Sequence, residues 1–156
     1  MGAPETTARK TIASNRKALH DFFVMERVEA GIALVGTEVK AVRTGQASLA
    51  GSFARVENDE VWLHHANIPP YEFGNRFNHD PLRTRRLLLH RREIDKLKAH
   101  AEQKGHALVP LSLYLHRGRV KVDLGICKGK RQSDKRETLR RKTADMEAKR
   151  AMADHR

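Results

Sequence analysis

Two stretches of strictly alternating residues, joined by a short turn, constrain the fold of this chain most. The turn is Arg117-Gly118, and apolar side chains recur at every second position on both sides of it. These apolar positions are Val109, Leu111, Leu113 and Leu115, then Val120, Val122, Leu124 and Ile126. Period-two alternation around a turn that contains Gly is typical of a β-hairpin with one buried face. The sequence therefore predicts an antiparallel hairpin over residues 108–127.

Other segments predict further strands and two short helices. The predicted strands are a long one over 19–34, bent at Gly31, a hairpin of strands 52–57 and 60–66, and one over 82–92 with Leu87 to Leu89 buried. The predicted helices cover 36–45, with Thr37 as the N-cap, and 93–104, with Ile94, Leu97 and Ala101 facing inward. No βαβ units alternate along the chain. We therefore expect a mainly β fold, a small closed antiparallel β-barrel of oligonucleotide-binding (OB) type with two or three short helices and a basic C-terminal tail. An open sheet is the alternative.

The chain divides into three parts by composition. Residues 1–11 lack periodicity and are expected to be a loose arm, and residues 12–127 supply the barrel. Residues 128–156 are strongly basic, with an apolar stripe of only Leu139 and Met146 before Met152 near the end. A helix without a packed face is marginal in water, so we expect this tail to be disordered alone and helical on a polyanionic partner.

The net charge of the chain limits the kinds of partner that we expect it to bind. The formal net charge is +12 and the pI is about 10.3, which favours nucleic acid or an anionic membrane surface. No segment joins a wide apolar face to a basic one, so the membrane is the weaker candidate. With Cys127 as the sole cysteine, no intramolecular disulfide can form. We expect a cytoplasmic monomer without a cofactor or metal.

The distribution of arginines favours RNA over DNA. Arg83, Arg85, Arg86, Arg91 and Arg92 surround a predicted strand, and no recognition helix or zinc-finger spacing is found. Basic groups on strand ends and loops suit recognition of the shape and backbone of a folded RNA. The alternative is a solvated rim that only aids solubility.

The histidines do not indicate an enzyme. Neighbouring residues of a strand point to opposite faces, so neither His64 and His65 nor His20 and Asp21 are expected to converge. The chain carries no glycine-rich phosphate loop and no nucleophile–base signature, and a ribonuclease is therefore the third of three hypotheses. Trp62 and Tyr114 are expected in the core or barrel wall. Cys127 is expected to pack at a strand end, where Lys128 would raise its thiolate fraction.

Short motifs along the chain occur in the order found in one family. They are Asn15-Arg16-Lys17, His20-Asp21-Phe22, Glu29-Ala30-Gly31-Ile32, Gly36-Thr37-Glu38-Val39-Lys40, Ile68-Pro69-Pro70-Tyr71, His79-Asp80-Pro81-Leu82-Arg83, Val109-Pro110-Leu111, Lys128-Gly129-Lys130 and Asp134-Lys135-Arg136. In this ordered set the chain resembles the SsrA-binding protein family (small protein B), which partners transfer-messenger RNA (tmRNA) in bacterial ribosome rescue. The resemblance runs from about Thr11 to the C-terminus.

The resemblance implies a function for each part of the chain. An OB-type barrel would hold the transfer-RNA-like domain of tmRNA in place of the missing anticodon arm. The tail would fold as a helix in the empty messenger channel of a stalled ribosome, near the decoding centre. By this resemblance RNA binding falls to Asn15, Glu38 and Lys121, and we add His20, Lys40, Arg43, Arg85 and Arg86. The ribosome-directed residues of the tail are Lys128, Gly129, Lys130, Arg131, Asp134, Lys135 and Arg136.

From the residues alone, several of these positions have simpler structural roles. Glu38 is favoured as an acid stabilised by the positive end of a helix, an effect of about 0.3–1 kcal/mol. Asn15 is favoured as a turn residue, and for Lys121 a phosphate contact and plain solvation are equally expected. Relatives often carry a ring where this chain has Ser133, so base stacking is not expected from that position. The alternative function is a generic single-stranded RNA-binding module of the same barrel class.

Overall fold

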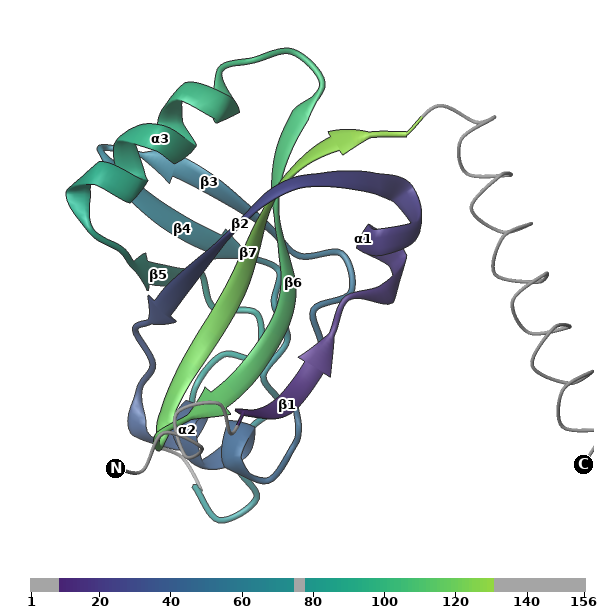
Figure 1. Ribbon diagram of the computed structural model, residues 1–156. Helices are drawn as coiled ribbons and strands as arrows, with labels where there is room; N and C mark the ends of the chain where they lie inside the picture. Colours follow the sequence, from purple (N-terminus) through teal and green to yellow (C-terminus); the bar gives the residue numbers. More distant parts are fainter. Residues whose placement is uncertain (1–8, 75–77, 131–156) are drawn as a thin grey trace, which may run out of the picture.

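The computed structural model describes residues 9–74 and 78–130 of the chain, and this part forms seven strands and three helices (Figure 1). In chain order these are β1 (Arg9–Ser14), α1 (Arg16–Asp21), β2 (Phe22–Ile32), α2 (Gly36–Arg43), β3 (Phe53–Glu57), β4 (Glu60–His64), β5 (Arg85–Leu88), α3 (Arg91–Ala101), β6 (His106–His116) and β7 (Arg119–Gly129).

The strands pair antiparallel into a closed ring. The order of neighbours is β1-β6-β3-β4-β5-β2-β7, and a further pairing of β6 with β7 joins the two sides. β1 lies outside the ring, on β6. The three helices occupy separate places on the ring, with α2 at the lower end in Figure 1, α3 at the upper end and α1 at the side. The predicted fold class, mainly β with antiparallel strands closed on themselves, is confirmed.

The core lies inside this ring and follows the predicted pattern along β7. Val122, Leu124 and Ile126 have no exposed surface and pack with buried side chains from every other strand of the ring. In β6 the predicted single buried face is wrong, because a bulge between Pro110 and Ser112 shifts the alternation, so that Leu108 before it and Leu113 after it both lie in the main core. Leu111 therefore leaves the main core and packs in a second, smaller cluster with Val109, Ala18 and Cys127.

The strand predicted to begin at Leu19 begins at Phe22 instead, because α1 occupies Arg16–Asp21. The side chain of Asn15 caps this helix, and its Oδ1 accepts a hydrogen bond from the Ala18 amide at 3.2 Å. The bend expected at Gly31 coincides with a change of partner. β2 pairs with β7 up to Gly31, which also pairs with Leu88 of β5. A Cβ at Gly31 would lie 3.2 Å from that of Leu88, so glycine suits this crossing.

Both ends of the predicted barrel domain lie further out in the structure. β1 begins at Arg9, inside the stretch expected to be a loose arm, and its pairing with β6 runs from Arg9 opposite His116 to Ser14 opposite Ser112. A polar strand on the outside of a ring has no buried alternation to reveal it in sequence. β7 continues to Gly129, two residues beyond the predicted boundary, so Lys128 and Gly129 belong to the sheet.

Three elements of the middle region, β5, α3 and α2, differ from their predictions. β5 covers only Arg85–Leu88, with Leu87 buried and Leu88 45% exposed, since alternation on a short strand leaves one face outside. α3 begins at Arg91 and buries Leu97, but Ala101 at its end is exposed. α2 begins at Gly36 after Val35 as its N-cap. Thr37 is thus inside the first turn rather than capping it.

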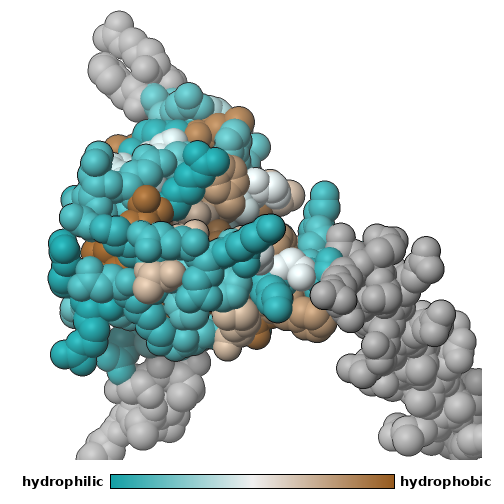
Figure 2. All heavy atoms as spheres, turned by 90° about the horizontal axis from the view of Figure 1, so that it is seen from above, coloured by the Kyte–Doolittle hydropathy of each residue, from teal (hydrophilic) through white to brown (hydrophobic). Residues whose placement is uncertain are grey.

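Hydrophilic residues cover most of the surface seen from above, with separate hydrophobic patches between them (Figure 2). Among the described residues, no helix has the length and apolar content that crossing a membrane requires.

Candidate nucleic-acid interface

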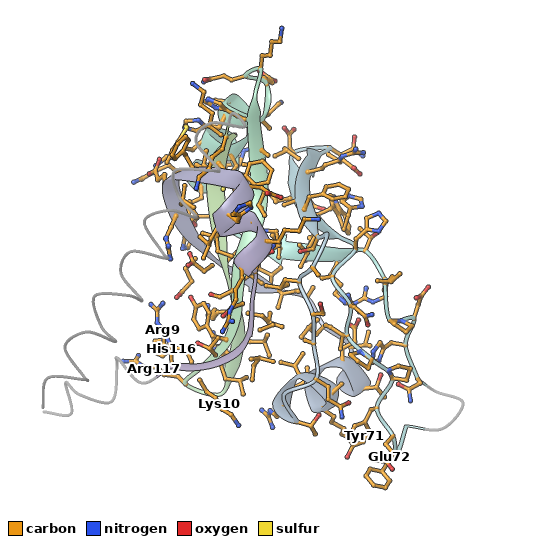
Figure 3. All side chains as sticks on the ribbon, turned by 90° about the vertical axis from the view of Figure 1, so that its right-hand side faces the viewer. Arg9, Lys10, Tyr71, Glu72, His116 and Arg117 are labelled. Carbon is orange, nitrogen blue, oxygen red and sulfur yellow. The ribbon has the colours of Figure 1, made fainter. Side chains whose placement is uncertain are left out.

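Basic side chains from three elements gather at the end of the ring that carries α2. The β6–β7 turn and the start of β1 lie at this end, where Arg9, His116 and Arg117 form one corner with Lys10 beside it (Figure 3). Nη2 of Arg43, at the end of α2, donates to the Gly118 carbonyl of the turn at 3.5 Å. We name this surface the α2 end. Its exposed basic residues are Arg9, Lys10, Lys40, Arg43, Arg117 and Arg119.

A carboxylate on β2 organises part of the α2 end. Glu29 accepts a hydrogen bond from the Tyr114 hydroxyl, and the Arg9 guanidinium lies 3.5 Å from the same carboxylate oxygen, Oε2. Nζ of Lys121 lies 4.0 Å from Oε1, and the Arg9 guanidinium also lies 4.8 Å from the centre of the Tyr114 ring. One carboxylate therefore holds two cations and a phenol in fixed relative positions.

The surroundings keep the Glu29 side chain as a charged carboxylate and the Tyr114 side chain as a neutral phenol. The hydrogen bond from Tyr114 lowers the pKa of Glu29, with help from Lys121, Arg9 and His116, although burial opposes the shift. Burial raises the pKa of Tyr114 well above its ordinary value, and so does the negative charge of Glu29 that its hydroxyl faces. Glu29 is 41% exposed, so it remains an acceptor for a ribose hydroxyl or a base amino group.

Two shallow grooves meet at Lys121. The first has a volume of about 410 Å³ and runs between Leu34, Val39, Leu88 and Arg119. The second, of about 450 Å³, is lined by Glu29, His90 and Glu93 among others. Lys121 lines both grooves, as do Gly31 and Leu88. This placement is that of an outward, phosphate-accessible lysine rather than a residue of the core.

Glu38 lies near the α2 end but inside the protein, enclosed by two arginines. Its Oε1 accepts from Arg83 Nη2 at 2.6 Å and from the Val35 amide at 2.9 Å. Its Oε2 accepts from Arg85 Nε at 2.5 Å. Arg85 also donates to the carbonyls of Ala66, at 2.8 Å, and Pro81, at 3.1 Å. The triad thus ties α2 to β5 and to the loop that precedes β5.

Burial and hydrogen bonds act in opposite directions on the pKa values of Glu38 and Arg85. Burial by itself would raise the pKa of Glu38, but the hydrogen bonds from Arg83, Val35 and Arg85 hold that pKa below its ordinary value. Burial lowers the pKa of Arg85, and the carboxylate of Glu38 opposes the shift. The side chains of Glu38 and Arg85 have no exposed surface. The predicted direct contact with RNA does not fit this burial, and their place in the structure is that of positioning residues.

The predicted residues around α1 lie at the other end of β7. Asn15 is buried, and besides capping α1 its Nδ2 donates to the Pro110 carbonyl at 2.9 Å, which agrees with the turn interpretation. His20 is half-buried and its Nδ1 lies 3.0 Å from Oδ1 of Asp21. The expectation that these two side chains diverge is wrong, because they belong to a helix and not to a strand.

The root of the tail packs beside α1. The Lys130 amide donates to the Asp21 carbonyl at 3.0 Å, and its ammonium lies 5.1 Å from the centre of the exposed Phe23 ring. Lys128 and Gly129 are exposed at the end of β7. The other predicted tail residues, Arg131, Asp134, Lys135 and Arg136, lie outside the described residues, as does Ser133.

Comparison with known proteins identifies the family of this chain. The family model described as SmpB protein matches residues 12–154. The chain belongs to the SmpB protein family. Relatives named SsrA-binding protein, from Geobacillus thermodenitrificans (strain NG80-2) and Bacillus cereus (strain ATCC 10987), are 55% and 56% identical over 145 residues. Each of these alignments covers 93% of this chain and 94% of the relative.

A solved structure gives the same result at the level of the fold. It is described as "tmRNA-SmpB: a journey to the center of the bacterial ribosome", and its matching chain is 49% identical with a TM-score of 0.66. The match covers 82% of this chain and 94% of that chain. The family resemblance predicted from the ordered motifs is therefore confirmed.

In this SmpB-family chain the predicted RNA-binding residues divide between separate places. Lys40, Arg43 and Lys121 come together at the α2 end, whereas His20 lies with Lys128 and Lys130 at the other end of β7. Arg86 is exposed on β5 and pairs with Glu60 at 3.1 Å. Sequence reasoning missed Arg9, Glu29 and Tyr114 as one group. The available signal was the alternation of Arg27 and Glu29 with Val28 and Ala30, which places Glu29 on the outer face of β2.

His64, His65 and Cys127 have structural surroundings in this SmpB-family chain. His64 and His65 both contact the Phe53 ring, at 5.2 and 5.4 Å between centres, because β4 ends at His64 and His65 has a φ of 63°. Both imidazoles thus pack on one phenyl ring, and that they do not converge on one metal or phosphate stays a prediction. Among the described residues, no three His, Cys, Asp or Glu side chains are placed to hold a metal. Burial raises the pKa of Cys127 to about 11, opposite to the expected effect of Lys128.

Proposed function

We propose that this SmpB-family protein is a non-enzymatic adaptor that binds the transfer-RNA-like domain of tmRNA and delivers it to stalled ribosomes for trans-translation. The α2 end of the barrel binds the folded RNA. The basic tail that follows β7 occupies the empty messenger channel near the decoding centre. The protein acts as a cytoplasmic monomer, since its partners are bacterial ribosomes and their RNA.

One observation carries the division of labour between barrel and tail. The basic α2 end and the root of the tail lie at opposite ends of β7, with Lys121 near one end of the strand and Lys128 near the other (Figure 1). A folded RNA on the α2 end therefore leaves the tail root clear. The names of the SsrA-binding relatives and of the tmRNA–SmpB structure supply the partners.

The α2 end recognises RNA through backbone and shape. Lys40, Arg43 and Lys121 bind phosphates, and Arg9 adds a planar donor beside them. Glu29 repels phosphate and accepts from a ribose hydroxyl, so it selects how the backbone lies between the cations. The buried triad of Glu38, Arg83 and Arg85 acts indirectly, because it fixes α2 and thereby Lys40 and Arg43.

The surface around α1 faces the ribosome together with the tail. His20, Lys128 and Lys130 present polar and cationic groups at the point where the tail leaves the barrel. By the family resemblance, Arg131, Asp134, Lys135 and Arg136 of the tail act with them on the ribosome. Folding of the tail becomes favourable only where ribosomal RNA neutralises its charge.

A comparison of RNA ligands tests the proposal. The full-length protein is titrated with the transfer-RNA-like domain of tmRNA and with a single-stranded RNA of equal length, at several salt concentrations. The adaptor should bind the folded RNA more tightly at every salt concentration. A generic single-stranded RNA-binding module, the second candidate, would prefer the open strand, and that result would replace the proposal.

A further inference from the structure

An aromatic pair projects into solvent from the loop between β4 and β5. Phe73 is 72% exposed, the highest value for a large hydrophobic side chain among the described residues. Its ring meets that of Tyr71 edge to face, with centres 5.6 Å apart and planes at 69°. Tyr71 and Glu72 project from the molecule next to α2 (Figure 3). The pair thus adjoins the α2 end.

The backbone that carries the two rings is firmly held. The Asn78 side chain accepts from the Tyr71 amide at 2.9 Å and donates to the Tyr71 carbonyl at 2.6 Å. His79 bridges the Thr37 hydroxyl on α2, at 2.8 Å, and the Ile68 carbonyl, at 2.7 Å. At Gly74 a Cβ would lie 2.6 Å from Asn78 Nδ2, so a larger residue there would force the Asn78 amide out of its hydrogen bonds with Tyr71. The loop therefore presents its rings from a preorganised frame.

The charges around the pair point to an anionic strand. Nζ of Lys40 lies 5.7 Å from the centre of the Tyr71 ring, and Arg43 is exposed one turn further along α2. Glu72 is exposed between the two ring residues and repels phosphate, so a phosphate is directed to the Lys40 side. An aromatic face next to a lysine is the arrangement by which proteins bind unpaired nucleotides, with the base stacked and the phosphate paired.

We propose that Phe73, supported edge-on by Tyr71, stacks on one unpaired base of the bound RNA, while Lys40 binds the adjacent phosphate. The edge-to-face contact occupies one side of the pair and leaves aromatic surface of Phe73 open for the base. This inference rests on the proposed function, because it takes the bound RNA as the source of the base. It adds a stacking contact to an interface otherwise built from charge and shape.

Fluorescence of a base analogue tests the stacking. The transfer-RNA-like domain is prepared with 2-aminopurine at each of its unpaired loop positions in turn, and each RNA is titrated with the full-length protein. One position should show quenching on binding. Phe73→Ala should abolish that quenching and weaken the affinity roughly 5- to 150-fold. Phe73→Tyr should retain both.

Two variants distinguish stacking on a base from a general apolar contact. Phe73→Leu keeps an apolar side chain without a ring, so it should behave like Phe73→Ala. Phe23→Ala removes another exposed phenylalanine, beside Lys130 at the other end of β7, and should leave the quenching and the affinity unchanged. Equal unfolding midpoints for all variants would confirm that each protein is folded.

Three results would overturn the inference. They are normal affinity of Phe73→Ala, quenching that persists in Phe73→Leu, and quenching at no loop position. If Phe73→Leu binds normally while Phe73→Ala does not, the contact is a general apolar one to protein or sugar, and stacking is wrong. If the unaltered protein binds the folded RNA no better than single strands, the proposed function fails and this inference falls with it.

Discussion

Glu38 is enclosed by Arg83 and Arg85, and its charge is matched only by theirs. Glu38→Gln would leave the Arg85 guanidinium buried without a counter-charge. Breaking a buried pair in this way costs about 3–5 kcal/mol, and we expect a loss of that size in the free energy of unfolding measured with urea. Glu29→Gln is the matched control, because Glu29 is 41% exposed and its loss should cost less than about 1 kcal/mol. Equal losses in the two variants would contradict the role given to Glu38.

Glu38→Gln should also change how the free energy of unfolding depends on pH. Since the pKa of Glu38 lies below its ordinary value of 4.5 in the folded protein, the unfolded chain binds this proton more readily than the folded chain does. The stabilisation is therefore present above about pH 4.5 and is lost as the pH falls through the folded-state pKa. Unfolding measured between pH 3 and 7 should be less steeply pH-dependent for Glu38→Gln than for the unaltered protein.

Cys127 is buried, and its pKa is raised to about 11. Because the thiolate is the reactive form, we expect alkylation by iodoacetamide at pH 8 to be slow in the native protein and fast in urea. The two rates should differ by more than tenfold when the labelled fraction is followed by mass. Similar rates with and without urea would show that the strand end opens readily in the native state.

Single residues show where sequence reasoning stops. Asn15 was predictable as a turn residue, since its cap is made with Ala18 three positions away. The burial of Glu38 was not, because the arginines that surround it lie 45 and 47 positions away and are indistinguishable in sequence from the exposed Arg86. Local signals report local contacts, and the partners of this carboxylate are set by tertiary structure.

The β6–β7 hairpin makes a close contact at Gly125. A Cβ there would lie 2.9 Å from Leu111 Cδ1 and 3.0 Å from Cys127 Sγ. Gly125→Ala should therefore lower the stability by about 1–3 kcal/mol through overpacking. In the same strand a Cβ at Gly129 meets nothing within 4 Å, so Gly129→Ala should leave the urea midpoint nearly unchanged. A neutral Gly125→Ala would mean that Leu111 can move aside.

If the α2 end binds phosphates, the affinity for RNA should depend on salt concentration through its basic residues. Lys121→Ala should weaken binding of the transfer-RNA-like domain, and the slope of log affinity against log salt should fall by about 1 as one phosphate contact is lost. Lys98→Ala, on the exposed face of α3 at the other end of the ring, is the matched control and should leave the slope unchanged. An unaltered slope for Lys121→Ala would remove Lys121 from the interface.

Among the elements, those with one buried face were predictable and the others were not. β7 alternates without interruption, and its core residues are those the pattern gives. β1 has only Ile12 and Ala13 as apolar residues and pairs outside the ring, and α1 is a six-residue helix whose N-terminus is capped by Asn15. The bulge places Leu111 against Ala18 of α1, and a period-two pattern carries no information about such a contact between distant elements.

For the whole molecule, the division between barrel and tail leads to a truncation experiment. Ending the chain after Lys130 should leave affinity for the transfer-RNA-like domain within about twofold, since the α2 end is intact and distant contacts act independently. The same variant should fail to support tagging on stalled ribosomes in a reconstituted translation system. If affinity for free RNA falls as far as tagging does, barrel and tail are not separate in function.

The composition and ordered motifs of the whole chain were sufficient to predict its fold class and family. They were not sufficient to place the RNA-binding residues, because the pairings of β1 with β6, β6 with β7 and β7 with β2 bring residues from distant parts of the chain together around Glu29. A strand order that joins the first and last parts of the chain cannot be read from spacing.

β7 pairs with β2 on one side and with β6 on the other. Each of these two pairings contains one bulge, which lies in β2 or β6 and not in β7. From Lys121 to Gly129 it advances on the order of 27 Å at about 3.4 Å per residue, and two flanking ladders prevent it from stretching. The RNA cargo and the origin of the tail are therefore separated by a rigid spacer. Under the proposed function, movement of the bound RNA on the ribosome therefore also moves the point from which the tail starts, while the tail itself folds only where it meets ribosomal RNA.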